Sequence, residues 1–201
     1  MSRAPQPEKR WMPRMLRLAA AVVALGCSAW GRAPDFHLKD TESREHTASE
    51  WKGKKAILLF FVTTDCPIAN SYVPEMNRIS HDYADRGVLV WGIQTDPTIP
   101  TAEVARYARD YRYQFPLVLD PQQLLVAYTG ATITPQAAVL SPEGKILYLG
   151  RIDNRVADFG KQRFQATSFD LRTALDAVLA GKPVAHPITK SIGCAINRLQ
   201  P

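Results

Sequence analysis

The sequence predicts an α/β protein with a central mixed β-sheet flanked by α-helices. Two observations favour this class: hydrophobic runs with strand character alternate with amphipathic helical segments, and the last two expected strands form a hairpin. The chain has 201 residues, of which 46% are hydrophobic and 22% are charged. This length and composition suit one globular domain with a single core.

The first half of the domain is expected to hold its central strand and its first helix. Residues 36–38 alternate apolar and polar side chains, which predicts a short edge strand. The unbroken apolar run of residues 54–64 predicts a strand buried on both faces. A helix is expected from Pro67, because proline suits the first helical turn, and Pro74 is expected to kink it. Its buried face would comprise Ile68, Tyr72, Met76, Ile79 and Tyr83.

The second half repeats the alternation of strands and helices. Residues 87–96 predict another buried strand, and residues 101–112 predict an amphipathic helix with Thr101 as its N-cap. A final helix is expected within residues 168–183, where a glycine followed by a proline ends it. Further strands are expected at 117–120, 135–142 and 145–153, with a turn at 141–144.

Residues 1–29 predict an export signal. A basic stretch ends at Arg17, and the apolar run 18–26 that follows is too short to span a bilayer as a mature helix. Two processing sites compete: an imperfect lipobox that ends at Cys27, which would then carry a lipid, and a small-x-small site at 27–29. An uncleaved membrane anchor is the remaining alternative. In each case we expect the folded domain to be exported, either periplasmic or membrane-anchored and facing the periplasm.

The folded domain is expected to span residues 33–183, followed by a tail at 184–201 that carries Cys194. The formal net charge is +6, but the leader alone holds five basic residues against one acidic residue. In the rest of the chain Lys and Arg are scattered among acids. This pattern gives no electrostatic footprint for nucleic acid, so we expect no nucleic-acid partner.

Cys66 lies where the central apolar strand gives way to the helix that begins at Pro67. Unpaired N–H groups and the helix dipole favour a thiolate at a helix N-terminus, whereas the neighbouring Asp65 carboxylate opposes it. Ala69 stands where a vicinal resolving thiol would lie, and Asn70 is expected to donate a hydrogen bond toward the sulfur. The residues alone leave two interpretations open, a reactive thiol and a buried inert cysteine.

Thr134-Pro135 lies at the start of an expected strand. A cis peptide bond in a tight turn and an ordinary trans proline at a strand start both fit this position. Without further context, the rarity of cis bonds favours the trans form.

Several segments together resemble the thioredoxin-like superfamily: APDFHLKD (33–40), LLFFVTTDCPIANSYVPEM (58–76), Thr134-Pro135 and AVLSPEGKILYLGRID (138–153). More narrowly, the chain is similar to exported redoxins of the alkyl hydroperoxide reductase and thiol-specific antioxidant type. The similarity covers nearly all of residues 33–181. It implies a thioredoxin fold, with Cys66 as the nucleophile and Pro135 as a cis-proline beside it.

The chain departs from the two best-known patterns of this superfamily. Thioredoxins carry Trp-Cys-x-x-Cys, and here an aspartate and an alanine replace the tryptophan and the second cysteine. Peroxiredoxins carry Pro-x-x-x-Thr-x-x-Cys; Thr63 fits this pattern, but Leu59 replaces its proline. Their peroxide-activating arginine has no counterpart next to Pro135. Arg151, at the end of a neighbouring strand, is the candidate to replace it.

Cys194 is the candidate partner of Cys66. Cys27 belongs to the leader, which leaves two cysteines, and two cysteines in an oxidising compartment can form one disulfide. The apolar residues Ile188, Ile192 and Ile196 suggest that the tail packs on the domain. Cys194 is therefore expected to be a distant resolving cysteine or a structural disulfide partner, and a free thiol on a mobile tail is the alternative.

Three functions follow as hypotheses. The leading one is a thiol–disulfide oxidoreductase without a cofactor, in which Cys66 attacks a protein disulfide and Cys194 resolves the mixed disulfide. The second is a peroxiredoxin-like enzyme that reduces a hydroperoxide at Cys66. The third is a non-catalytic scaffold or copper carrier, in which His186 joins both thiols on Cu(I). The oligomeric state stays open. One surface ion-pair cluster is also expected: Arg151, Asp153 and Arg155.

Overall fold

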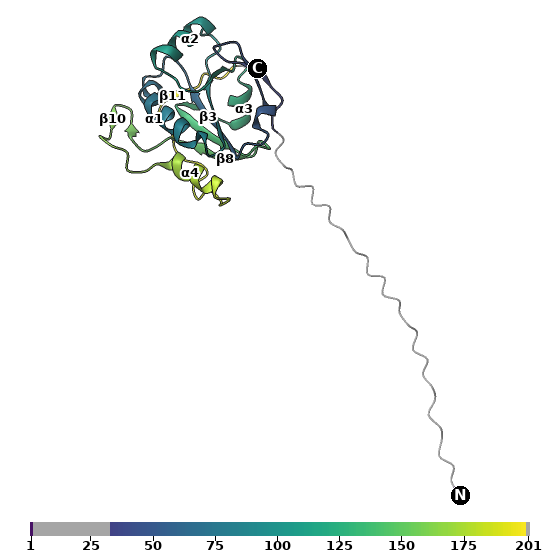
Figure 1. Cartoon of the computed structure of the whole chain (residues 1–201). Coiled ribbons are helices and arrows are strands. Elements are labelled where there is room, and N and C mark those ends of the chain that lie inside the picture. The colour runs from purple at the N-terminus through teal and green to yellow at the C-terminus, as the bar shows by residue number, and fades with distance from the viewer. Residues whose placement is uncertain (2–32, 200–201) are drawn as a thin grey trace.

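The computed structural model describes Met1 and residues 33–199 (Figure 1). The expected export signal, with its alternative processing sites around Cys27, lies outside these residues. The described chain is an α/β fold built on a mixed five-stranded sheet, as the sequence predicts. No helix within residues 33–199 is long and apolar enough to cross a membrane.

The central sheet has the strand order β5-β4-β3-β7-β8. Its middle strand, β3 (Ala56–Val62), is wholly buried and pairs in parallel with β4 (Val88–Gln94). On its other side β3 runs antiparallel to β7 (Gln136–Leu140), which pairs with β8 (Ile146–Gly150). β5 (Leu117–Leu119) completes the sheet beside β4. The unbroken apolar run of the sequence therefore marks the centre of the sheet, as expected.

Helices cover both faces of this sheet (Figure 1). α1 (Pro67–Ala84), α2 (Thr101–Asp110) and α4 (Asp170–Leu179) pack on one face, and the short α3 (Leu124–Thr129) packs on the other. β3 contributes to both cores because successive side chains of a strand point to opposite faces. The predicted inner face of α1 is buried, except that Ile68 in its first turn is only partly buried.

Two element boundaries differ from the sequence-based expectations. Thr101 is not the N-cap of α2; it is the first helical residue, and the preceding Pro100 occupies the cap without a side-chain hydrogen bond. The strand expected at 135–142 is shorter, β7 (Gln136–Leu140), and a separate strand, β6 (Ile133–Thr134), lies just before Pro135. Proline has no N–H to donate to a β-ladder, which explains why the two strands are separated at Pro135.

Three two-stranded sheets surround the central one. β1 (His37–Lys39) pairs with β2 (Glu45–Thr47), so the expected edge strand stands in a small sheet of its own. β9 (Val156–Asp158) and β10 (Lys161–Gln162) form a hairpin before α4. β11 (Cys194–Ala195) pairs with β6, which brings the C-terminal tail back to the strand that precedes Pro135.

Aromatic side chains fill the core on the α3 face. The 3₁₀ helix η1 (Ala48–Trp51) buries Trp51, whose ring centroid lies 5.6 Å from that of Phe36 and 6.3 Å from that of Trp91. A capping box at Thr47 fixes the start of η1. Trp51 and Trp91 are both fully buried and therefore belong to the core.

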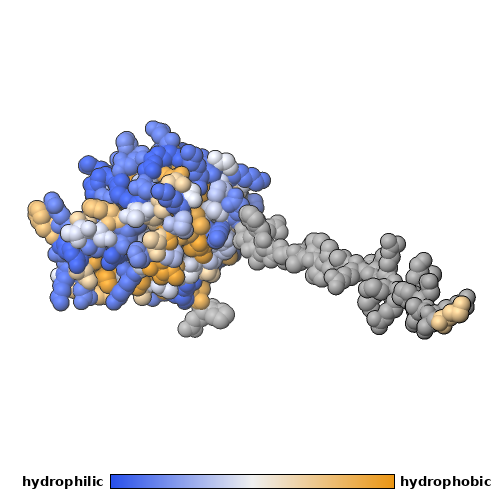
Figure 2. All heavy atoms as spheres, turned by 90° about the horizontal axis from the view of Figure 1, so that it is seen from below, coloured by the Kyte–Doolittle hydropathy of each residue, from blue (hydrophilic) through white to orange (hydrophobic). Residues whose placement is uncertain are grey.

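Hydrophobic side chains also reach the surface. On the side of the molecule where α4 lies, they interrupt a largely hydrophilic surface (Figure 2). The segment between β8 and α4 carries three exposed phenylalanines, and one of them, Phe164, is 98% exposed. The other two are Phe159 and Phe169. Because these rings contribute little to either core, the order of this segment depends on the polar contacts at its base.

Candidate active site

Cys66 stands between β3 and α1 as the N-cap residue of the helix. Its side chain is buried, with 0% of the residue exposed. The sulfur accepts a hydrogen bond from the Ala69 N–H at 3.4 Å and donates one to the Thr134 carbonyl at 3.0 Å. The predicted position at a helix N-terminus is confirmed. The backbone of Ala69 supplies the donor at the place where a second thiol would otherwise lie.

The C-terminal tail brings Cys194 onto Cys66. β11 runs antiparallel to β6, with Cys194 opposite Thr134, whose carbonyl accepts the Cys66 thiol. Gly193 passes so close to that carbonyl that a Cβ atom at this position would collide with it. Both thiols are free, and Cys194 lies beside Cys66, near enough for each thiol to shift the pKa of the other. Ile192 also packs on the core and Ile196 is buried, whereas the Ile188 side chain is exposed. The backbone around Ile188 nevertheless hydrogen-bonds to Leu149 of β8, so the earlier part of the tail also lies on the domain.

The two thiols have opposite acidities. Burial raises the pKa of Cys66, but hydrogen bonds from the Cys194 thiol, the Ala69 N–H and the Thr134 hydroxyl together outweigh it and hold the pKa below its ordinary value. Burial, the hydrogen bond to Cys66 and the charge of the Cys66 thiolate raise the pKa of Cys194 to about 12. The pair therefore favours a thiolate at Cys66 beside a protonated thiol at Cys194.

The Thr134–Pro135 peptide bond is cis. The family resemblance implied this isomer, whereas the general rarity of cis bonds favoured the trans form. Thr134 is fully buried and touches both cysteines: its carbonyl accepts from Cys66, and its hydroxyl lies 3.5 Å from the Cys194 carbonyl. The contact of Thr134 with both cysteines cannot be predicted from local sequence, because it depends on where the distant tail crosses β6.

Thr63 follows the last residue of β3. Its carbonyl accepts the Cys66 N–H at 3.3 Å, and its buried hydroxyl has no hydrogen-bond partner among the described residues. Thr63 lines a small pocket, about 160 Å³ in volume, that opens beside Cys194. Asp65 and Asp96 are the charged residues of that lining.

Asn70 does not hydrogen-bond to the Cys66 sulfur, contrary to the expectation. Its amide nitrogen donates to the Thr64 carbonyl at 3.2 Å and to the Tyr111 hydroxyl at 3.1 Å. Its amide oxygen accepts from the Tyr107 hydroxyl at 2.8 Å. These bonds use both amide protons and fasten α2 to the first turn of α1. Burial raises the pKa of Tyr107 to about 12, and the nearby Cys66 charge adds to that rise.

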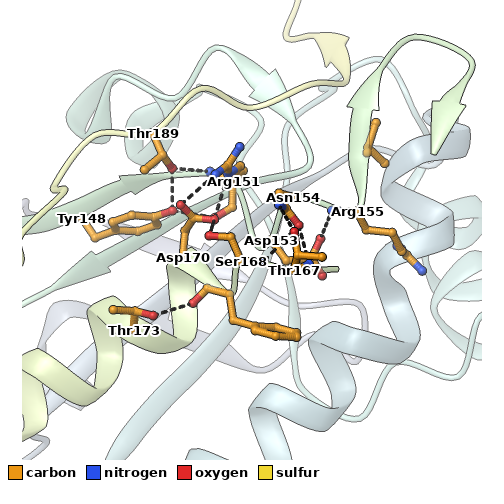
Figure 3. Close-up of polar contacts among 12 residues, drawn as sticks. Tyr148, Arg151, Asp153, Asn154, Arg155, Thr167, Ser168, Asp170, Thr173 and Thr189 are labelled. Atoms are coloured by element: carbon orange, nitrogen blue, oxygen red, sulfur yellow. Dashed lines mark hydrogen bonds and ion pairs between the residues drawn. The ribbon is translucent and has the colours of Figure 1, made fainter. Parts of the chain in front are cut away.

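Arg151 belongs to a polar network at the end of β8 (Figure 3). Its guanidinium donates from Nε and Nη2 to the two carboxylate oxygens of Asp170 at 2.8 and 3.0 Å. The backbone N–H of Arg151 donates to the Thr189 hydroxyl. This guanidinium makes no hydrogen bond to Cys66, so Arg151 does not stand in for the peroxide-activating arginine as expected. The Arg151 network comprises Tyr148, Arg151, Asn154, Thr167, Ser168, Asp170 and Thr189.

The expected surface ion-pair cluster of Arg151, Asp153 and Arg155 does not form. Asp153 is buried and accepts the Tyr72 hydroxyl at 2.6 Å and the Arg155 N–H at 2.8 Å. The Arg155 guanidinium donates to the Ser71 carbonyl and lies over the Tyr72 ring, 4.3 Å from its centroid. These contacts fasten the loop after β8 onto α1, which is a structural role that the short spacing in the sequence does not reveal.

The copper hypothesis required His186 to join the two thiols. His186 is exposed, and residues 33–199 contain no group of three His, Cys, Asp or Glu side chains arranged to hold a metal ion. The thiol pair therefore has no third ligand of this kind beside it.

Comparisons with known proteins add to this geometry. The AhpC/TSA family model matches residues 31–149. The chain is similar to the thiol-disulfide oxidoreductase ResA of Geobacillus thermodenitrificans, with 33% identity over 125 residues, 62% of this chain and 67% of that relative. It is also similar to a crystal structure of a hypothetical protein from Sinorhizobium meliloti 1021, with 31% identity and a TM-score of 0.73. That likeness covers 85% of this chain and 94% of the other. A conserved protein from Geobacillus kaustophilus has 25% identity and a TM-score of 0.71, over 85% of this chain and 91% of the other.

Proposed function

This chain belongs to the AhpC/TSA family and has a thioredoxin-like fold, and we propose that it is a thiol–disulfide oxidoreductase whose redox couple is Cys66 and Cys194. One observation carries the proposal: the C-terminal tail places Cys194 beside Cys66, and the pKa of Cys66 is lowered while that of Cys194 is raised. Similarity to thiol-disulfide oxidoreductases supports the same reaction class.

The Cys66 thiolate attacks one sulfur of a partner disulfide. A bond forms between the Cys66 sulfur and that sulfur, the partner's S–S bond breaks, and the other partner sulfur leaves as a thiolate. Cys66 then no longer carries the negative charge that raised the pKa of Cys194. Cys194 loses its proton more readily, attacks the Cys66 sulfur and expels the second partner thiolate, which leaves a Cys66–Cys194 disulfide and a reduced partner.

Cys66 becomes reachable for a protein partner only when the tail moves, because Cys66 is fully buried. Around β11 the tail is held by bonds such as that from the Ile196 N–H to the Thr132 carbonyl, 2.9 Å, and that from the Gln123 side chain to the Asn197 carbonyl, 2.7 Å. Further bonds join Arg198 to the Ala131 carbonyl and Thr189 to β8. The pairing of β11 with β6 extends over only two residues. Such short pairings open locally at a free energy well below that of global unfolding.

The site favours disulfide exchange over the two other hypotheses. A peroxidase needs a cationic group beside the thiolate to bind and polarise the peroxide, and Arg151 is engaged by Asp170 instead. A copper carrier of the kind expected needs His186, which is exposed. Exchange needs only a thiolate and a second thiol in reach.

Export is part of the proposal. The basic and apolar segments of residues 1–29 support a signal for export, by release or by lipid attachment at Cys27, with the redoxin domain at 33–183 and the tail at 184–201. A redox couple that forms a disulfide suits an oxidising compartment. The partner we propose is a protein that carries a thiol or a disulfide.

The reduced full chain, mixed with a disulfide-bonded protein such as insulin, tests the function. We expect release of partner thiols together with a Cys66–Cys194 disulfide, located by peptide mass spectrometry. A Cys194→Ser variant should accumulate a mixed disulfide at Cys66, whereas Cys66→Ser should form none. Absence of the Cys66–Cys194 disulfide in the native chain contradicts the proposal. Oxidation of Cys66 by one equivalent of hydrogen peroxide faster than by the disulfide favours the peroxidase instead.

A further inference from the structure

The two sulfurs differ in how solvent reaches them. Cys66 is 0% exposed beneath the tail, whereas Cys194 is half-buried and lines the 160 Å³ pocket. Because the pairing of β11 with β6 already places Cys194 beside Cys66, we expect a disulfide between them to leave this pairing in place. In the oxidised protein a small molecule can therefore approach the disulfide from the Cys194 side only.

The pocket is also chemically distinctive. Asp65 and Asp96 are its charged lining residues, and within residues 33–199 neither forms an ion pair. One oxygen of Asp65 accepts the Thr64 hydroxyl, and one oxygen of Asp96 accepts from Thr98, so each carboxylate is held in place with a second oxygen left for a ligand. The buried Thr63 hydroxyl in the same lining has no hydrogen-bond partner in the described chain.

We propose that this pocket is the entry site for the thiol that reduces the oxidised protein, that the thiol attacks the Cys194 sulfur, and that the pocket takes neutral or cationic thiols. The inference rests on the proposed function, since it presupposes the Cys66–Cys194 disulfide. The unopposed carboxylates repel an anionic thiol and attract an ammonium group.

The electrons balance over two steps. A thiolate R–S⁻ bonds to the Cys194 sulfur, the Cys66–Cys194 bond breaks, and its electron pair leaves with Cys66 as a thiolate. A second R–S⁻ then attacks the R sulfur of the mixed disulfide, which forms R–S–S–R and releases Cys194. Cys194 takes a proton from water, and the two thiols have supplied both electrons.

The acidities of the two cysteines support this direction of attack. In thiol–disulfide exchange the thiol with the lower pKa is the better leaving group. Attack at Cys194 expels Cys66, whose pKa is held below its ordinary value, whereas attack at Cys66 would expel the less acidic Cys194. The accessibility of Cys194 and the better leaving group, Cys66, therefore both favour attack at the Cys194 sulfur.

The test uses the oxidised full chain and three small thiols of similar size: cysteamine, 2-mercaptoethanol and 2-mercaptoethanesulfonate, which are cationic, neutral and anionic. Each reduction rate is divided by the thiolate concentration and by the same thiol's rate toward a free dialkyl disulfide. We expect the anionic thiol to be roughly fivefold to tenfold slower than the cationic one at low salt. The Asp65→Asn/Asp96→Asn variant should remove most of this difference, and the matched control Asp158→Asn should keep it.

Acid quenching followed by peptide mass spectrometry locates the intermediate, which should be a mixed disulfide on Cys194 with Cys66 free. A mixed disulfide on Cys66, or equal normalised rates for all three thiols, overturns the inference and leaves the proposed function intact. Charge selectivity that survives in the double variant also overturns it. If no Cys66–Cys194 disulfide can be prepared, the proposed function fails first and the inference falls with it.

Discussion

The thiol site and the Arg151 network both contain residues that the sequence singles out, but their hydrogen bonding differs. In the network, both carboxylate oxygens of Asp170 accept from Arg151, and Ser168 adds a further donor. At the thiol site, by contrast, Cys66 and Cys194 compete for one proton. The hydroxyl of Thr63, three residues before Cys66, has no hydrogen-bond partner among the described residues.

This difference separates a structural role from a chemical one. Buried polar groups whose bonds are all made hold elements together, and Arg151 with Asp170 ties the end of β8 to the start of α4. Groups with perturbed pKa values and incomplete bonding are where reactions take place. The comparison predicts that damage to the network lowers stability while damage to the thiol site lowers activity.

The largest expected effect is the loss of exchange in Cys66→Ser. A serine hydroxyl is not ionised at neutral pH and cannot form a disulfide, so the rate with a disulfide-bonded protein should fall by at least about a thousandfold. The thermal midpoint should stay close to that of the native chain, because the substitution is nearly isosteric. A Cys66→Ser variant that folds and keeps its exchange rate would show that Cys66 is not the nucleophile.

The network is tested by Asp170→Ala. This change leaves Arg151 and Ser168 without their acceptor and removes an acidic residue from the first turn of α4, so the free energy of unfolding in urea should fall by about 1–3 kcal/mol. Arg151 is partly exposed, and solvent limits the ion-pair part of this loss. The exchange rate at Cys66 should stay within about twofold of native, since the network makes no contact with the thiols.

Asp158→Ala, in the neighbouring hairpin, is the control for removal of a carboxylate, and it should change stability by less than about 0.5 kcal/mol. If Asp170→Ala abolishes disulfide exchange in a protein that still folds, the Arg151 network is not purely structural and the proposed difference between the two regions is wrong.

The sequence predicts those parts of the site that depend on local order. The strand at 54–64 and the helix from Pro67 are marked by a continuous apolar run and by a helical period, and together they fix Cys66 at the helix N-terminus. The cis bond at Pro135 required the family resemblance, because local sequence left both isomers open. Local pattern thus locates the nucleophile and not its surroundings.

The remaining contacts join residues far apart in the chain. β11 is two residues long, too short to show a period, so the contact of Cys194 with Thr134 could not be read from the tail. Asp170 lies 19 residues after Arg151 and leaves no spacing signal, which is why the ion pair was assigned to closer neighbours. The same limit explains Asn70, whose partner Tyr107 comes from a different helix.

A smaller effect is expected from Thr134→Val, which removes one of the hydrogen bonds that hold the pKa of Cys66 below its ordinary value. The fraction of thiolate at neutral pH should fall about threefold to tenfold, the equivalent of one hydrogen bond. Ultraviolet absorbance of the thiolate against pH measures this fraction. Thr129→Val, which removes another buried threonine hydroxyl that bonds to the Leu125 carbonyl, is the matched control and should leave the titration unchanged. An unchanged titration in Thr134→Val would mean that the hydroxyl has no part in stabilising the thiolate.

The smallest effect is on stability against pH in the reduced protein. The pKa of Cys66 is lowered by folding, so its contribution is present above the unfolded pKa of about 8.5 and is lost as pH falls through the folded value. The pKa of Cys194 is raised to about 12, so its contribution is present below the unfolded pKa and is lost as pH rises toward 12. Above pH ~8.5 only the Cys194 contribution still changes.

Urea unfolding of the native chain and of Cys194→Ser between pH ~8.5 and pH ~10 should therefore show a stability difference that shrinks with rising pH. A difference that stays constant or grows over this range would mean that Cys194 is not held as a protonated thiol beside a Cys66 thiolate. The perturbed acidity of the two cysteines would then no longer distinguish the thiol site from the Arg151 network, and only the positions of the two sulfurs would. The Asp170→Ala variant should show the same pH dependence as the native chain in this window, since its loss of stability comes from groups that do not titrate there.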